Sequence, residues 1–300
     1  MIVNTRLQHQ FESAAGGVAR RERQWQNRVR DAFSLIEVMV AVALLTVIVV
    51  GLLMMFNQTQ RVFRASITQT DVLEGGRATM NMLAQELEQA AATHFNATNF
   101  LVVITTAPLL QVLPPQTANV RRTNVAEEVF FLTCVNQQWY ATGYRVDPPG
   151  AGVGTLYRFY TNVPASRIWQ AISDFFNTPP RTLSRVADGV VHFRVRACDL
   201  NGMVITNDIA VANSYGGVET NIFAWYNPPS GEFNYVFRSN ALPVAVELEL
   251  GILEPPALAR FRAISNKPAL ARDFLSGRVG AVHLFRQRIP IRNVDPEAYR

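Results

Sequence analysis

The sequence predicts an α+β fold, in which a long N-terminal helix, apolar in its first half, packs on an antiparallel β-sheet. Three patterns predict it. Residues 38–56 form an uncharged apolar run, residues 77–90 continue as an amphipathic helix, and strand-like segments separated by turns follow from residue 93. The 300 residues are 49% hydrophobic and 17% charged, a composition that excludes a disordered chain.

The first 32 residues concentrate the positive charge. They hold six arginines against three acidic residues, which is +3 of the net +5 of the whole chain. The remaining chain is close to neutral, and a general nucleic-acid-binding protein would show a basic patch there instead. We therefore expect no nucleic-acid partner.

The apolar run is long enough to cross a membrane. Its 19 residues, 38–56, are interrupted only by Thr46 and Gly51, and with residues 33–37 they give a helix candidate of 24 residues. A bilayer core needs about 20 apolar residues in a helix. A buried helix of a soluble domain would show a polar face, and this run has none. The sequence therefore predicts a single-pass membrane helix.

A cleaved secretory signal is the main alternative for this segment. Such signals have an apolar core of about 7–15 residues and a small-x-small cleavage site, and neither is found at the end of this run. The pair Arg20-Arg21 gives weak support to a twin-arginine signal. Five arginines lie shortly before the run, whereas Arg61 and Arg64 follow it, so the positive-inside rule predicts a cytoplasmic N-terminus and an exported C-terminal part.

Glu37 is unusual for a simple anchor, because an ionised carboxylate in hydrocarbon costs on the order of 3 kcal/mol unless it reaches the interface or has a partner. The segment AFSLIEVMVA, residues 32–41, closely resembles the class III signal of type IV prepilins and pseudopilins. This resemblance implies cleavage by a prepilin peptidase between Ala32 and Phe33, followed by N-methylation of Phe33. Ala32 stands where the family usually has glycine, which leaves the efficiency of cleavage open.

The resemblance also implies a role for Glu37. After cleavage, Phe33 would carry a protonated amine in an apolar environment, and a carboxylate of a neighbouring subunit would neutralise it. Removing one partner of a buried charge pair costs about 3–5 kcal/mol. Glu37 would thus set the axial register of assembly. The simpler alternative is a carboxylate that reaches the membrane interface.

The chain after the apolar run divides into a helix continuation and a head. In the continuation, Met80, Leu83 and Leu87 share one face, and Gly75-Gly76 predicts a kink or short break before a helix end near residue 92. The expected domains are a leader at 1–32, a membrane or filament-core helix at 33–56, an amphipathic helix at 57–92 and a β-rich head at 93–300.

The head contains segments with the residue composition and the alternation of apolar and polar residues that are typical of strands. We expect strands at 99–106, 128–135, 139–146, 155–162, 191–197 and 244–250, a long final strand within 278–293, and short helices at 167–176 and 256–264. The arginines of 191–197 and the glutamates of 244–250 fall on the polar faces of their strands, where they could pair across strands.

Chemical motifs are scarce. No catalytic motif appears, so we expect no catalytic residue and no enzyme. Cys134 and Cys198 lack zinc spacing, so no metal site is expected; they could form a disulfide in an oxidising compartment or remain two buried thiols. The glycine-rich segment 150–154 reads as a hairpin loop, and Asp199-Leu-Asn-Gly as a turn, with calcium in the head as a minor alternative.

The head also resembles one branch of the family. Residues 183–202, 242–250 and 283–293 resemble strands that J-type minor pseudopilins carry late in the chain, and W-type minor pilins are similar. This implies a pilin-like minor pseudopilin of a type II secretion pseudopilus, acting in tip assembly and protein export. The expected partners are other pseudopilins, the prepilin peptidase, the inner-membrane assembly platform and membrane lipid.

The expected location is the bacterial inner membrane and then a periplasmic filament, with the N-terminus cytoplasmic and the head periplasmic. Two alternatives remain. One is a minor pilin of a type IV pilus or DNA-uptake system. The other is a membrane-tethered periplasmic enzyme or binding protein that keeps its N-terminus.

Overall fold

The computed structural model describes residues 33–93, 96–113, 121–148, 152–212 and 218–299. The chain divides into two units, Met1–Phe63 and Arg64–Arg300, and each is described by itself. Ala32, the residue expected before the cleavage site, and residues 150 and 151 of the glycine-rich segment 150–154 lie outside the described residues.

The first described element is helix α2 (Leu35–Leu87), a 53-residue helix that is unbroken along its length. The predicted kink or break at Gly75-Gly76 is therefore wrong. Gly76 serves close packing instead, because a Cβ atom at this position would lie 2.1 Å from the ring of Phe285. Burial of Met80, Leu83 and Leu87 in the head offsets the cost of about 1 kcal/mol that each glycine brings to a helix.

The head contains a ten-stranded sheet in the order β12-β11-β7-β6-β5-β4-β1-β10-β9-β8 and a separate pair, β2-β3. Every named strand pair is antiparallel, which confirms the predicted α+β fold class. The strands are β1 (Thr98–Ile104), β2 (Leu109–Val112), β3 (Arg121–Asn124), β4 (Glu127–Val135), β5 (Gln138–Asp147), β6 (Gly154–Val163), β7 (Ser184–Cys198), β8 (Ile209–Ala212), β9 (Val218–Asn227), β10 (Glu232–Arg238), β11 (Ala245–Leu253) and β12 (Val282–Pro290).

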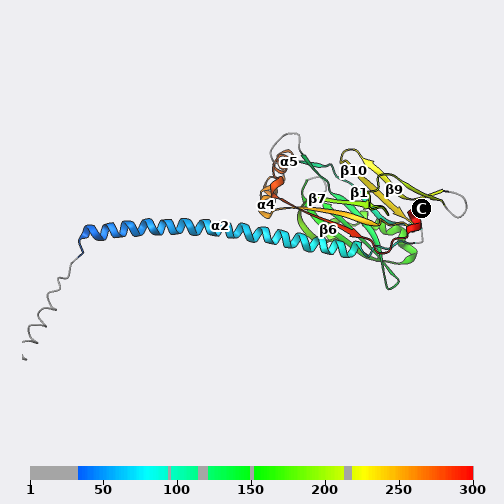
Figure 1. Cartoon of the computed structure of the whole chain (residues 1–300), viewed down its shortest axis with the longest axis horizontal. Helices are drawn as coiled ribbons and strands as arrows, with labels where there is room; N and C mark the ends of the chain where they lie inside the picture. Colours follow the sequence, from blue (N-terminus) through cyan, green and yellow to red (C-terminus); the bar gives the residue numbers. More distant parts are fainter. Residues whose placement is uncertain (1–32, 94–95, 114–120, 149–151, 213–217, 300) are drawn as a thin grey trace, which may run out of the picture. The chain divides into compact units, whose positions relative to one another are not determined.

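Short helices complete the head. They are η1 (Ala165–Gln170), α3 (Ala171–Asn177), η2 (Pro180–Thr182), α4 (Pro255–Ile264), α5 (Pro268–Ser276), η3 (Val279–Ala281) and η4 (Pro296–Tyr299). The predicted helices at 167–176 and 256–264 correspond to η1 with α3 and to α4, whereas α5 was not predicted. Helices α4 and α5 lie next to one another at one end of the sheet (Figure 1).

Three apolar clusters hold the head together. The largest joins Leu83 and Leu87 of α2 to Phe193 of β7 and Leu248 of β11, all of them fully or almost fully buried. A second packs Phe175 of α3 against β4, β5 and β6, and a third lies beneath α4 and α5. Full burial of one such side chain stabilises the fold by about 1.5–3 kcal/mol, so the C-terminal part of α2 is an integral part of the head.

The polar faces of β7 and β11 pair as the sequence predicted. Arg194 lies opposite Glu249 and Arg196 opposite Glu247 in the register, and the Nη2 atom of Arg194 is 2.6 Å from Oε1 of Glu249. This face is more buried than expected. Glu232 of β10 closes over it, with Oε1 2.9 Å from Nη1 of Arg194 and 2.7 Å from Nη2 of Arg196.

The two cysteines do not form the suggested disulfide. Both are free thiols, Cys134 exposed on β4 and Cys198 buried at the end of β7. Strands β5 and β6 lie between β4 and β7 in the sheet. Neighbouring strands are about 4.8 Å apart and a disulfide needs Cα atoms within about 7 Å, so the sheet order keeps the two thiols apart.

Candidate processing and assembly site

The start of α2 is defined by Ser34. The backbone N–H of Glu37 donates to Oγ of Ser34 at 3.2 Å and to its carbonyl oxygen at 3.0 Å, and the N–H of Val38 donates to the same carbonyl at 3.2 Å. Ser34-Leu35-Ile36-Glu37 thus has the S-x-x-E sequence of a capping box. The sequence interpretation missed this role of Ser34, although the spacing of serine and glutamate carries the signal.

Glu37 lies in the same hollow as the residue that would become the new N-terminus. Phe33, Glu37, Val38 and Ala41, with Val42 and Leu45 further along, line a shallow open hollow of about 410 Å³. Phe33 precedes the cap and is not itself helical, but its side chain lines the same hollow as that of Glu37. Within the described residues no ion pair involves the Glu37 carboxylate, so a cation from another molecule can approach it.

The apolar helix that follows is uncovered. Its large side chains from Leu35 to Phe56 are all exposed. Among the described residues one helix, α2, is long and apolar enough to cross a membrane, and no residue of its apolar window is buried. A continuous apolar surface of this extent marks a site of contact with lipid or with other chains.

Residues 27–53 match a protein-family model described as the prokaryotic N-terminal methylation motif. The chain carries a type IV pilin-like signal. The matched residues include Ala32, Phe33, Ser34 and Glu37 together with most of the apolar run. Comparison with curated proteins and with solved structures gives no match.

This motif supports a pilin or pseudopilin, and it implies processing by a prepilin peptidase and assembly with other pilins. With the apolar helix, it is consistent with a membrane-anchored protein that assembles into a filament. The cleavage between Ala32 and Phe33, the methylation of Phe33 and the register role of Glu37 stay predictions.

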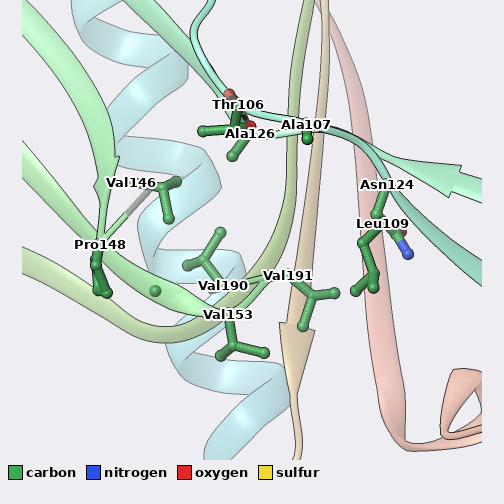
Figure 2. Close-up of a pocket in the computed structure, with 12 residues that line it drawn as sticks. Thr106, Ala107, Leu109, Asn124, Ala126, Val146, Pro148, Val153, Val190 and Val191 are labelled. Atoms are coloured by element: carbon green, nitrogen blue, oxygen red, sulfur yellow. Dashed lines mark hydrogen bonds between the residues drawn. The ribbon is translucent and has the colours of Figure 1, made fainter. Parts of the chain in front are cut away.

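Two features of the head bear on ligand binding. Asp199 closes a turn, because its Oδ1 accepts hydrogen bonds from the backbone N–H groups of Asn201 and Met203 at 2.9 and 2.8 Å. In the described part of the chain no group of three or more His, Cys, Asp or Glu residues is placed to hold a metal, and calcium stays a prediction. Figure 2 shows a small cavity lined by Val146, Val190 and Val191; its volume of about 10 Å³ suits at most one water molecule.

Several ionisable groups around the polar face of β7 and β11 have shifted pKa values. Complete burial raises the pKa of Glu127 well above its usual value, although the backbone N–H of Val195 donates to the carboxylate. Burial also lowers the pKa of His192, which is 2% exposed. Burial acts to raise the pKa of Glu249, but the hydrogen bond from His192 and the charge of Arg194 outweigh it and lower the pKa to about 2. These groups link strands of the head.

Proposed function

We propose that the chain is a minor pseudopilin of a type II secretion pseudopilus, which helps to start assembly at the filament tip during protein export. The observation that carries this proposal is the arrangement at the start of α2. A capped first turn carries Glu37, which shares a hollow with Phe33 directly before an exposed apolar helix. Such a helix can insert into a membrane first and bundle with equivalent helices later.

The chemistry of this face suits a docking role. After the proposed cleavage, the amine of Phe33 would carry a positive charge, and the Glu37 carboxylate of a neighbouring subunit would neutralise it. Because both groups sit at a helix start that is fixed by Ser34, the pairing defines how far one helix is displaced along the next. We propose that the protein has no enzymatic activity and that the head lies in the periplasm, with the leader on the cytoplasmic side.

The large head supports a minor subunit. It contains a ten-stranded sheet. The three segments that resemble J-type pseudopilins fall on β7, β11 and β12, and these strands lie beside one another in the sheet. The gene neighbourhood separates the two related systems: a secretin and a K-type gene would favour type II secretion, and a retraction ATPase would favour a type IV pilus.

Mass analysis of the purified protein tests processing first. The expected N-terminus is N-methyl-Phe33, whereas an intact Met1 would exclude the filament proposal and favour a membrane-tethered periplasmic protein. Assembly is then tested with Glu37→Ala and Glu37→Gln. Both variants should insert into the membrane and be cleaved but fail to co-purify with other pilin-like subunits.

A matched control uses Glu74→Ala, since Glu74 is an exposed glutamate on the same helix outside the motif. This variant should assemble like the wild type. Undiminished assembly of Glu37→Ala would remove the register argument, and failure of Glu74→Ala would show that any loss of charge on α2 is harmful.

A further inference from the structure

Strand β12 is a long and regular edge of the sheet. It is the outermost strand at its side, and it pairs with β11 over nine consecutive residues, from Ala245 opposite Pro290 to Leu253 opposite Val282, without a register shift. The opposite edge is different: β8 has four residues, and its pairing with β9 is shifted. Short or irregular edges are common protection against unintended strand pairing, and β12 has neither feature.

Charges alternate from strand to strand as this edge is approached. In one row, Arg194 of β7, Glu249 of β11 and Arg286 of β12 lie side by side in the register. The Oε1 atom of Glu249 is 2.6 Å from Nη2 of Arg194 and 2.8 Å from Nε of Arg286. The sequence of charges across the sheet is basic, acidic, basic.

A second row repeats this order two residues away. Arg196 of β7 lies opposite Glu247 of β11, which lies opposite Arg288 of β12. Cross-strand pairs of opposite charge stabilise a sheet, and like charges directly opposite destabilise it. A strand added beyond β12 would therefore be favoured if it placed acidic side chains next to Arg286 and Arg288.

The outer side of this basic row is accessible. The side chain of Arg286 is 65% exposed, and Arg288 is exposed while its Nη2 donates to the carbonyl oxygen of Gly202 at 2.8 Å. Glu247, Glu249, Arg286 and Arg288 line an open groove of about 320 Å³. Strand β12 itself contains no acidic residue, so its edge is basic.

We propose that β12 binds an extended strand of a neighbouring filament subunit that carries acidic residues at alternate positions. That the partner is a filament subunit rests on the proposed function. That its strand carries alternate acidic residues rests on the two rows of charges. Backbone hydrogen bonds to the edge would supply affinity, and the pairing of acids with Arg286 and Arg288 would set the register.

The test uses the full-length chain in detergent micelles and a fluorescent nine-residue peptide in which glutamate alternates with valine. Fluorescence anisotropy measures its affinity. A peptide with lysine in place of glutamate and a fully N-methylated glutamate peptide, which has lost its backbone donors, should each bind at least 10-fold more weakly. Binding of the first peptide should also slow amide hydrogen exchange in β12 and leave that of β8 unchanged.

Charge reversal provides an independent measurement. Arg286→Glu combined with Arg288→Glu should invert the preference, so that the lysine peptide binds better than the glutamate peptide. The matched control is Arg181→Glu with Arg260→Glu, two exposed arginines on η2 and α4, which should keep the original preference.

Three results would overturn the proposal, two of them seen with a peptide that binds. One is a glutamate peptide that binds without slowing exchange in β12, and the other is equal binding of the N-methylated peptide. Absence of binding to the wild-type chain would likewise refute it and leave the two arginines as protection of the edge. None of these results depends on the N-terminus, whose mass tests the proposed function separately.

Discussion

The carboxylate of Glu86 on α2 lies 2.6 Å from the guanidinium of Arg158 on β6, and it also accepts a hydrogen bond from the hydroxyl of Tyr144 on β5. Both partners in the ion pair are partly buried. This contact ties the last turns of α2 to the middle of the sheet. Burial and the neighbouring carboxylate raise the pKa of Tyr144, so its hydroxyl stays a donor at all physiological pH values.

Glu86→Ala is expected to destabilise the head by about 1–3 kcal/mol, because it leaves the Tyr144 hydroxyl and the Arg158 guanidinium partly buried without their acceptor. Urea unfolding of the full-length chain in detergent, followed by tryptophan fluorescence, measures the change. Glu88→Ala is the control: Glu88 pairs with Arg292, whose side chain is 71% exposed, and its loss should cost less than about 1 kcal/mol. Equal effects of the two variants would contradict this assignment.

Gly76→Ala is expected to lower stability by about 1–3 kcal/mol, since its new methyl group would overlap the ring of Phe285. Gly75→Ala should instead raise stability by about 0.5–1 kcal/mol, because nothing lies within 4 Å of that position and alanine favours the helix. Thermal unfolding of both variants checks this. Partial recovery of Gly76→Ala by Phe285→Leu would confirm the clash, and stabilisation by Gly76→Ala alone would rule it out.

Glu127→Gln is expected to change how stability depends on pH. The raised pKa means that the folded head binds a proton more tightly than the unfolded chain, so this carboxyl favours folding below about pH 4.3 and loses that contribution as pH rises through the folded pKa. The variant should thus match the wild type near pH 4 and exceed it progressively toward pH 8. Urea unfolding across this range is the measurement, with Glu74→Gln as an exposed control that should follow the wild type.

The cysteines give a direct chemical test. Cys134 is exposed, whereas Cys198 is buried and burial raises the pKa of its thiol, so the folded chain should react with a maleimide at one site. Denaturant should add the second site. Peptide mapping should identify Cys134 as the labelled residue. If the chain took up label only after reduction, the two cysteines would form a disulfide, and the free thiols described above would be contradicted.

Much of the fold could be predicted because its signals are local. Periodicity and turns located α2, seven strands of the sheet and the helical segments that became η1 with α3 and α4. The charge pattern of 191–197 and 244–250 indicated that the polar faces of these strands could pair, and Arg194 and Glu249 do so. The motif around Phe33 and Glu37 is contiguous in sequence, so it could be recognised without knowledge of the fold.

Long-range contacts could not be predicted in this way. Strand β1 pairs with β10, and Thr98 lies opposite Arg238 in the register, but no local pattern specifies which distant strands meet. The ion pair of Arg194 with Glu232 likewise joins β7 to β10, two strands that are not neighbours in the sheet. The misread Gly75-Gly76 pair has the same origin, since the reason for Gly76 is a ring on β12 more than 200 positions later.

The cap at Ser34 has a consequence for maturation. Ser34 lies on the C-terminal side of the predicted cleavage point, so the residue that closes the first turn would remain after the leader is lost. The first turn of the helix would then keep its cap through cleavage. Cleavage would change the charge at the N-terminal end of the helix but would not remove the residue that caps it. The helix would lose the arginine-rich leader and gain one protonated amine at Phe33, which the Glu37 carboxylate of the next subunit could bind.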